Sequence, residues 1–344
     1  MKEFDVIIVG AGPAGLRCAE VLTNSDPELK ILLLERKQEV GPKVCAGGLT
    51  KKDLDLMEIP DTLFEHKVQR ATIKSPIYTS VNEKEGLVVL YAINRKEFGQ
   101  WQAGKLKNTG VELLTNAKVT AIDGNKVTVN LTEEYGYKYL VGADGVSSIV
   151  RRYLKLPVEK RLVTFQYTIP RSDDVRFEMY LNSKYFHSWY AWIFPHRNSL
   201  AVGCACDPEI MSPKKLKENF HKWLKENDLD ITNAKYESFP ISYDYRGYIF
   251  DNVFLTGEAA GLACGFTGEG IYQALVSGEE VAKTILDNGY VSQPMLKILK
   301  YNRIQHNLLK FLIKAGPLRN FIFNMIVLLL KNKGANSRIS KGLS

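Results

Sequence analysis

The segment KVCAGGLTKK at residues 43–52 places a thiol close to a pair of glycines. Because Gly47 and Gly48 have no side chains, the backbone here can lie against a flat ligand. The thiol of Cys45 could donate or relay a proton to a reacting atom within hydrogen-bond reach. Cys45 can equally be a small buried apolar residue, and the fold around it decides between these two interpretations.

The segment SWYAWIFPHR at residues 188–197 has aromatic side chains at alternating positions. In a strand, Tyr190, Trp192 and Phe194 would share one face. An aromatic wall suits a long apolar ligand, and Pro195 is expected to fix the chain where the strand leaves its sheet. An aromatic face packed in a core gives the same pattern, so the alternation alone leaves both interpretations open.

The N-terminal segment FDVIIVGAGPAGLRCAEVL at residues 4–22 reads as a buried strand, a glycine turn and a helix. Gly10 permits a tight turn, Gly12 lets the backbone approach a pyrophosphate, and Gly15 lets the helix pack closely on the strand. The helix N-terminus then offers N–H groups to the phosphates. Glu35 ends the second strand, where a carboxylate can bind ribose hydroxyls. The unit predicts a bound dinucleotide, either NAD or FAD.

Two glycine-containing segments later in the chain extend this pattern. Residues 139–154 give a strand followed by Asp144, and residues 251–282 give a strand, Glu258, a glycine-rich loop and a long helix. In this order after a dinucleotide unit, they resemble the FAD-binding signatures of the para-hydroxybenzoate hydroxylase superfamily. Arg95, which opens an amphipathic helix, is similar to the arginine that these flavoproteins place beside the cofactor.

This resemblance implies that the cofactor is FAD and that the FAD-binding domain is of the Rossmann type. The superfamily has Asp at the position of Glu258, where the carboxylate contacts the flavin's ribityl chain, so the extra methylene changes how that contact is reached. The expected cofactor contacts are Gly10, Gly12, Pro13, Ala14, Gly15, Glu35, Arg36, Cys45, Ala46, Gly47, Arg95, Val119, Asp144, Gly257, Glu258, Gly268, Gly270 and Ile271.

The whole chain resembles the geranylgeranyl reductases, which use reduced FAD to saturate isoprenoid double bonds. CAGG at 45–48 matches the CxxG motif of that family, and YAWIFP at 190–195 matches its YxWxFP motif. The resemblance implies hydride transfer from reduced flavin, together with a proton, to a polyprenyl chain of a membrane lipid or an isoprenoid quinone. The predicted catalytic residues are Cys45, Tyr190 and Trp192, and the predicted substrate contacts are Tyr190, Trp192, Phe194, Pro195 and Gly48.

Two other classes of protein share parts of this pattern. A flavin-dependent monooxygenase or halogenase has the same fold, but the related WxWxIP motif of halogenases has Trp and Ile where this chain has Tyr190 and Phe194. A non-catalytic prenyl-binding escort is the second alternative. No second GxGxxG unit for NADPH is present, so the expected electron donor is a docked protein such as an acidic ferredoxin, or another reductant.

The pattern divides the α/β chain into an FAD-binding domain, an antiparallel-sheet substrate domain and a C-terminal helical region. Strand patterns separate the three segments of the FAD-binding domain, which is therefore discontinuous in sequence. The predicted boundaries are 1–65, 93–160 and 245–290 for the FAD-binding domain, 66–92 and 161–244 for the substrate domain, and 291–344 for the helical region.

Composition limits the location and the partners. Five scattered cysteines fit neither a disulfide framework nor a zinc site, and the N-terminus lacks a signal-peptide pattern, so we expect a cytoplasmic protein without a metal. The net charge of +8 suits nucleic acid, an anionic membrane, an acidic partner or a solvated surface and specifies none of them. For a polyprenyl reductase we expect no nucleic acid as a partner. The apolar stretch at 308–334 is too interrupted to span a membrane. An interfacial helical pair, peripheral on the cytoplasmic membrane face, and a cap on the substrate cavity remain open.

Overall fold

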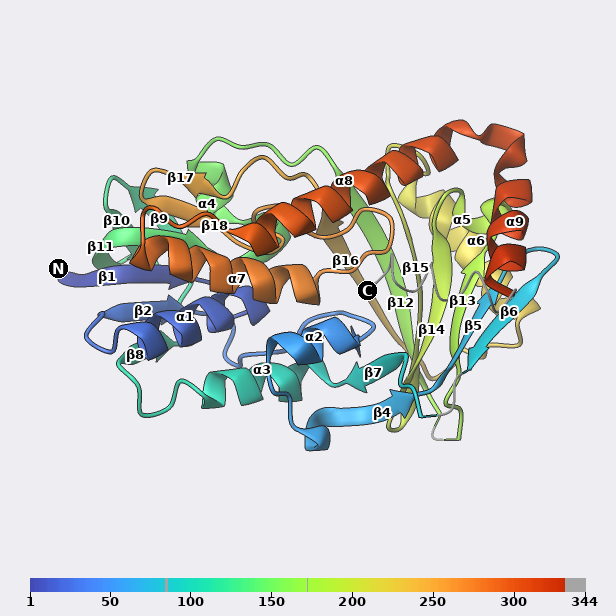
Figure 1. Cartoon of the computed structure of the whole chain (residues 1–344), viewed down its shortest axis with the longest axis horizontal. Coiled ribbons are helices and arrows are strands. Elements are labelled where there is room, and N and C mark those ends of the chain that lie inside the picture. Colours follow the sequence, from blue (N-terminus) through green and yellow to red (C-terminus); the bar gives the residue numbers. More distant parts are fainter. Residues whose placement is uncertain (84–85, 172, 332–344) are drawn as a thin grey trace.

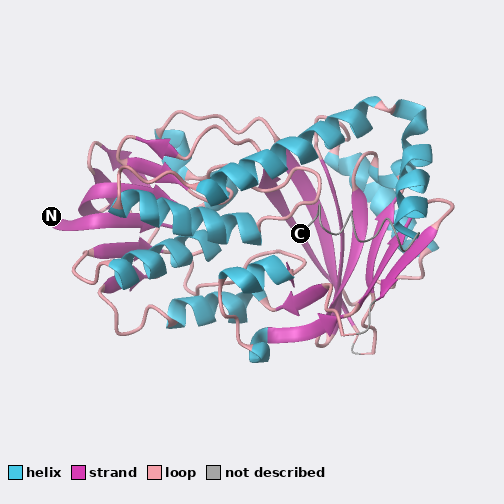
Figure 2. Cartoon of the chain, viewed as in Figure 1, coloured by secondary structure: helices cyan, strands magenta, loops and turns pink. Residues whose placement is uncertain are grey.

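The computed structural model describes residues 1–83, 86–171 and 173–331. Two large sheets lie toward opposite ends of the molecule, and a long C-terminal helix passes over both (Figure 1). Helices are concentrated around the N-terminal sheet, whereas strands dominate the other half (Figure 2). This arrangement confirms the predicted α/β fold class.

The first sheet has the strand order β17-β18-β11-β1-β2-β8, with β10 and β9 added beside β11. Its central strands are parallel, and their apolar residues are buried on both faces. Ile7 and Leu32 belong to one core cluster, while Ile8 and Leu33 belong to the cluster on the opposite face. The strands are β1 (Lys2–Val9), β2 (Ile31–Leu34), β8 (Val111–Leu114), β9 (Val119–Asp123), β10 (Lys126–Val129), β11 (Glu133–Gly142), β17 (Ile249–Phe250) and β18 (Val253–Leu255).

Helices α1 (Pro13–Ser25) and α7 (Ile271–Leu286) pack against each other beside this sheet. A Cβ built at Gly278 would lie 2.2 Å from the carbonyl oxygen of Ala14, so only glycine permits this approach. Both helices begin in loops that follow parallel strands. Ligands of open α/β sheets bind at the carboxyl ends of such strands, so the two helix N-termini mark the expected site.

The remaining helices connect the sheets and cover them. Asn94 caps the helix that Arg95 opens, and Ser212 caps α6 through a hydrogen bond from the Lys215 amide at 3.3 Å. The predicted helix that begins at Arg95 is therefore confirmed. The helices of this group are α2 (Lys51–Leu56), α3 (Arg95–Gly104), α4 (Ile149–Tyr153), α5 (Ser183–Phe186) and α6 (Pro213–Glu226), with 3-10 turns η1 (Asp61–Leu63) and η2 (Gly145–Ser147).

The second sheet has the order β16-β12-β15-β14-β13-β5-β6. All neighbouring strands are antiparallel except β13 and β5, which are parallel. The strands are β5 (Arg70–Lys74), β6 (Thr79–Glu83), β12 (Arg161–Pro170), β13 (Phe177–Leu181), β14 (Tyr190–His196), β15 (Ser199–Cys206) and β16 (Lys235–Ser242).

One expected strand of this sheet lies elsewhere. Residues 66–92 are predicted to belong to the antiparallel-sheet domain, but strand β7 (Leu90–Ile93) at the end of this segment pairs instead with β3 (Gly48–Leu49) and β4 (Phe64–Val68). Its apolar residues suit either sheet, and only the tertiary pairing selects one. The small sheet ties the end of the CAGG loop to the segment before Arg95.

The C-terminal region consists of α8 (Gln293–Lys314), η3 (Gly316–Leu318) and α9 (Arg319–Lys331). Within the described residues, no single helix is long and apolar enough to span a membrane; α8 and the segment 316–331 meet those criteria only as a pair bent by 112°. Residues 332–344, with the basic Lys333 and Arg338, lie outside the described part of the chain.

Arg151 holds the junction between the two sheets. Its guanidinium is almost fully buried and donates to the carbonyl oxygens of Pro157, Ala259 and Asp244 at 3.1 Å or less. The Asp244 carboxylate lies 3.5 Å away and offsets the buried charge. These contacts join the helix after β11 to the loops on either side of β17 and β18.

Candidate active site

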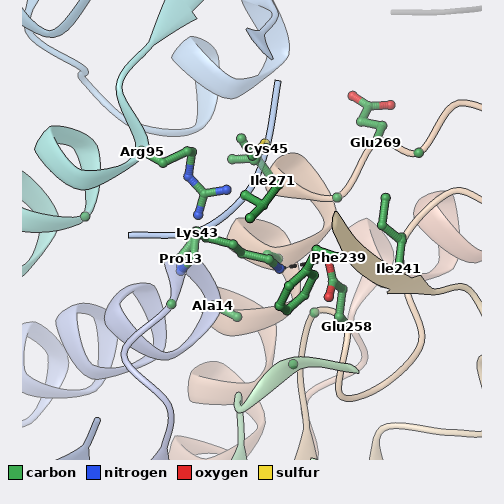
Figure 3. Close-up of a pocket in the computed structure, with 18 of the residues that line it drawn as sticks. Pro13, Ala14, Lys43, Cys45, Arg95, Phe239, Ile241, Glu258, Glu269 and Ile271 are labelled. Carbon is green, nitrogen blue, oxygen red and sulfur yellow. Dashed lines mark hydrogen bonds and ion pairs between the residues drawn. The ribbon is translucent and has the colours of Figure 1, made fainter. Parts of the chain in front are cut away.

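A cavity of about 620 Å³ lies where the two halves of the molecule meet. Its polar part is formed by loops that follow β1, β2, β11 and β18, and its apolar part by one face of β12, β14 and β16. Figure 3 shows labelled side chains from the segments after β1, β2 and β18 and from β16 around this space. One cavity therefore has a wall suited to a dinucleotide and a wall suited to an apolar chain.

In the glycine turn after β1, two glycines pack against the protein backbone and one faces the cavity. A Cβ at Gly10 would lie 2.5 Å from the Ala143 carbonyl oxygen, and one at Gly15 would lie 2.0 Å from that of Gly10. Gly12, the N-cap of α1, has no atom within 4 Å of its ideal Cβ position and lines the cavity. Space at a helix N-terminus of this kind suits a phosphate.

Glu35 lies at the end of β2 as expected. Its carboxylate accepts hydrogen bonds from the amides of Ala11, at 3.0 Å, and Lys37, at 2.9 Å. The side chain therefore borders the glycine turn and the cavity together. This is the position that a ribose-binding acid takes in a dinucleotide unit.

Three predicted cofactor contacts have buried polar atoms without a partner. They are Nε of Arg95, Oδ1 of Asp144 and Oε2 of Glu258, and all three residues line the cavity. Burial raises the pKa of Asp144 above its ordinary value. Buried polar groups are normally hydrogen-bonded, so these atoms and the open space at Gly12 fit a polar ligand such as FAD.

Glu258 uses its other oxygen in an ion pair that the sequence did not predict. Oε1 lies 2.9 Å from Nζ of Lys43, whose ammonium also lies 5.3 Å from the centre of the Phe239 ring. Figure 3 shows this pair reaching across the cavity from opposite loops. The longer side chain of Glu258 thus connects the loop after β18 to the loop after β2.

The CAGG loop packs directly on strand β14. A Cβ at Gly48 would lie 2.6 Å from the Phe194 ring, and one at Gly47 would lie 2.9 Å from Cε1 of His196. Nε2 of His196 lies 3.0 Å from the Ala46 carbonyl oxygen, which can only accept, and Nδ1 faces the carboxylate of Glu65. The two sequence motifs therefore form one surface.

Cys45 lines the cavity and also contacts the apolar cluster around Leu49 and Ile271. Its Sγ accepts a long hydrogen bond from the Gly47 amide at 3.4 Å. The thiol is half-buried, so it is neither fully enclosed in a core nor freely exposed. Its position suits a role at the ligand as well as one in packing.

The alternation along β14 has the predicted result. Tyr190, Trp192 and Phe194 line the cavity, whereas Ala191 and Ile193 are buried in the core on the other face. The Tyr190 hydroxyl donates to the Thr267 carbonyl, and burial raises its pKa, so the ring stays neutral. The Trp192 indole lies over Gly203, where a Cβ would be 2.3 Å from the ring.

Seventeen of the eighteen expected cofactor contacts line this cavity, all except Gly15. Four of the five expected substrate contacts line it too, all except Pro195.

 Arg95 lines the cavity and follows β7 of the small sheet. Gly15 does not line the cavity, because the side of Gly15 where a Cβ would stand faces the Gly10 carbonyl oxygen at 2.0 Å. Pro195 does not line it either: it is buried inside β14, which continues to His196 rather than leaving the sheet at the proline.

Several lining residues were not predicted from the sequence. Asp53 is buried with Oδ1 unpartnered, and burial raises its pKa to about 6 although the Thr50 amide donates to its other oxygen at 2.8 Å. The spacing of Thr50 and Asp53 is a capping-box signal that could have placed the pair at a helix start. The wall opposite the dinucleotide loops also includes residues of β12, β16 and α8, namely the polar Thr164 and Gln166 and the mostly apolar Leu162, Phe239, Ile241 and Tyr301.

Comparisons with known proteins agree with this geometry. The family model described as "FAD binding domain" matches residues 3–277. A digeranylgeranylglycerophospholipid reductase of Methanococcoides burtonii is 30% identical over 326 residues, which are 88% of this chain and 79% of that protein. The chain belongs to the geranylgeranyl reductase family of FAD-dependent oxidoreductases.

Solved structures support the fold of this FAD-dependent reductase. A geranylgeranyl bacteriochlorophyll reductase-like protein of Thermoplasma acidophilum has a TM-score of 0.81 at 23% identity, covering 97% of this chain and 92% of that one. A myxobacterial chondrochloren halogenase has a TM-score of 0.67 at 15% identity, covering 97% and 92%. The fold is therefore shared with enzymes of other activity, and FAD is the cofactor that the family and the cavity have in common.

We predict that Gly12→Val yields a folded protein that does not retain FAD. A Cβ at Gly12 has no protein atom within 4 Å, but the valine side chain occupies the space at the N-terminus of α1 that the cofactor needs. Circular dichroism and flavin absorbance after desalting measure folding and binding separately. Gly104→Val is the matched control, because its Cβ also has open space but the residue lies outside the cavity lining. Full yellow absorbance in Gly12→Val would contradict the assignment of the turn.

A second prediction concerns the contact behind the CAGG loop. Burial alone would raise the pKa of Glu65, but the hydrogen bond and charge of His196 bring it below the ordinary 4.5. A lowered carboxylate pKa stabilises the fold above pH 4.5, and this stabilisation is lost as the pH falls through the lowered pKa. Glu65→Gln should therefore cost about 1.5–3 kcal/mol near neutral pH and much less in acid.

Urea unfolding at both pH values measures this difference. The control is Glu134→Gln, which removes an exposed ion pair with Lys126 and should change stability little at either pH. A cost for Glu65→Gln that is the same in acid and at neutral pH would show that the carboxylate does not act through an ionic contact with His196.

Proposed function

We propose that the protein saturates carbon–carbon double bonds in geranylgeranyl-type chains of a membrane lipid or an isoprenoid quinone. The observation that carries this proposal is the contact between the CAGG loop and β14, which joins a thiol and an aromatic wall at one FAD-binding cavity. The relatives named for digeranylgeranylglycerophospholipid reduction support the same substrate class.

The apolar wall accounts for binding of a hydrocarbon chain. Trp192 and Phe194 of β14 face the same space as Phe239 and Ile241 of β16, and Tyr301 of α8 contributes from a third element. Burial of an isoprenoid chain against these side chains is favourable in proportion to the apolar area that leaves water. The polar part of the cavity borders this wall directly, because the Lys43 ammonium lies 5.3 Å from the centre of the Phe239 ring.

Saturation of an isolated alkene requires a hydride and a proton on adjacent carbons. FAD, when bound and reduced, supplies the hydride. Positive charge then develops on the more substituted carbon, and the faces of Tyr190 and Trp192 can stabilise it by about 0.5–2 kcal/mol each. The two rings meet at an angle of 66° with centroids 6.2 Å apart, so they can border one substrate carbon from different directions.

The chain supplies the proton from its own residues. Cys45 is the proposed donor, because its thiol lines the cavity on the loop that contacts the aromatic wall. Asp53 also lines the cavity and, with its pKa raised to about 6 by burial, can hold a proton under mildly acidic conditions. It is a candidate for restoring the proton of the thiol after each turnover.

The proposed setting is the cytoplasm, with peripheral contact to the membrane that contains the substrate. Electrons are proposed to come from a docked acidic protein of the ferredoxin type, or from another reductant, because the sequence has no second dinucleotide motif.

The test is anaerobic turnover of dithionite-reduced protein with a geranylgeranyl lipid and, separately, with a menaquinone, both in detergent. Mass spectrometry should show a mass gain of one hydrogen molecule for each double bond reduced. Hydroxylated product formed together with oxygen-dependent oxidation of NADPH would instead assign a monooxygenase. Protein that binds no flavin and only retains the lipid would assign an escort.

We further predict that Cys45→Ser retains FAD and slows alkene reduction by about a hundredfold, as expected for loss of a general acid. Cys45→Leu should also retain FAD but block the reaction, because the larger side chain fills the space beside the aromatic wall. Flavin absorbance verifies loading, and single-turnover oxidation of the reduced flavin measures the rate. Full activity in the Ser variant would show that the thiol of Cys45 does not donate the proton. Full activity in the Leu variant would show that this loop does not line the active site.

A further inference from the structure

The protein's excess positive charge lies in its last 52 residues, and seven of the ten basic residues there belong to α8 and α9. Ten of the 46 Lys and Arg residues, and none of the 38 Asp and Glu residues, lie after residue 292. The first 292 residues therefore carry two more acidic than basic side chains, although the whole chain has a net charge of +8. A charge difference this local indicates a surface with an anionic partner.

The same helices expose an apolar face. Phe311 is 57% exposed, Leu318 65% and Phe321 62%, and these three residues lie around the bend between α8 and α9. Figure 1 shows this bend at an outer corner of the molecule, away from the first sheet. Further exposed apolar residues continue along both helices, namely Leu296, Ile304, Leu308, Met325 and Leu329.

This exposed face is separate from the face that packs on the protein. Leu309 and Leu312 of α8, with Phe323 and Val327 of α9, are buried in core clusters. One face of these helices therefore packs in the core, and the exposed apolar residues on the opposite face have no partner within the described chain. Exposed lysines and arginines flank them, at Lys297, Lys300, Arg303, Lys310, Lys314 and Lys331.

Among possible occupants, an anionic bilayer fits these residues best. A second copy of the chain would bring the same row of positive charges against its equivalent, which is unfavourable. The sequence after Lys331 has only two large apolar residues, Ile339 and Leu343, too few to cover the face. A bent helical pair with apolar residues beside lysines is the pattern of a segment that lies in a membrane interface.

The helices also connect this face to the cavity. Tyr301 of α8 lines the cavity, and Leu312 and Phe323 share a core cluster with Tyr190 and Phe266 of the cavity wall. An apolar chain held in a bilayer would thus lie close to the helices that border the substrate space. The two interpretations of this region, interfacial pair and cavity cap, describe opposite faces of the same helices.

We propose that the exposed face of α8, η3 and α9 docks the enzyme on an anionic phospholipid surface, with the apolar corner around Phe311 and Phe321 inserted among the lipids. The docking explains how a membrane lipid reaches the cavity, and in that respect it rests on the proposed function. The surface itself can be tested without any substrate.

FAD-loaded protein is sedimented with phosphatidylglycerol vesicles and with phosphatidylcholine vesicles. Wild type should bind the anionic vesicles at least about tenfold more tightly, and raised salt should weaken that binding. Lys310→Glu with Lys314→Glu should lower the affinity by at least about tenfold, since each lysine near the surface contributes to binding. Phe311→Ser with Phe321→Ser should also lower it, through lost apolar contact.

Matched controls remove the same chemistry elsewhere. Lys222→Glu with Lys225→Glu reverses two exposed lysines on α6, and Leu131→Ser with Val175→Ser removes two exposed apolar side chains. Both should bind vesicles like wild type. Unchanged vesicle binding by the C-terminal variants would overturn the proposal, as would a dimer in solution that the Phe311→Ser, Phe321→Ser variant abolishes.

Turnover in detergent separates this proposal from the proposed function. The C-terminal variants should reduce detergent-solubilised lipid at the wild-type rate and lose activity only on vesicles. A wild type that binds anionic vesicles but reduces no lipid would leave the docking surface supported and the proposed function refuted.

Discussion

The close approach of the CAGG loop to strand β14 is the contact on which the active site depends. The loop can reach the strand because Gly47 and Gly48 present no Cβ to His196 and Phe194. His196 then holds the loop through the Ala46 carbonyl and is itself held by Glu65. A larger residue at either glycine would push the thiol away from the aromatic wall, so the chemistry of the cavity is set by backbone packing before any side chain acts.

Glycines also shape the cofactor part of the cavity, and there they have two different functions. At Gly10 and Gly15 a side chain would collide with the protein itself, whereas at Gly12 it would meet only open space. Gly10 and Gly15 are therefore required for packing within the protein, and Gly12 leaves room for a ligand. The buried unpartnered atoms of Arg95, Asp144 and Glu258 border the same space and indicate that the ligand is polar there.

Local patterns were sufficient to predict the elements and many of the site residues. The glycine turn and the period of two along β14 are properties of short segments, and both describe the structure correctly. Partnerships between distant segments were not predictable in this way: Lys43 and Glu258 are 215 residues apart, and the pairing of β7 with β3 and β4 depends on tertiary packing. The packing function of Gly15 was predicted from the turn, but its absence from the cavity lining becomes clear only from the structure.

The division of the cavity between two sheets makes their relative position a condition for activity. Reduction requires an apolar chain on the β14 wall to meet a cofactor held by loops of the parallel sheet, and reacting atoms must be placed within a few tenths of an ångström of productive geometry. Arg151 meets this condition by joining segments on both sides of the junction through three backbone carbonyls and the Asp244 carboxylate. A buried ion pair with these additional hydrogen bonds contributes little to net stability when compared with apolar packing, but it is strongly unfavourable to separate. Such a contact permits one arrangement of the two halves and resists others, which is what a site assembled across a junction needs.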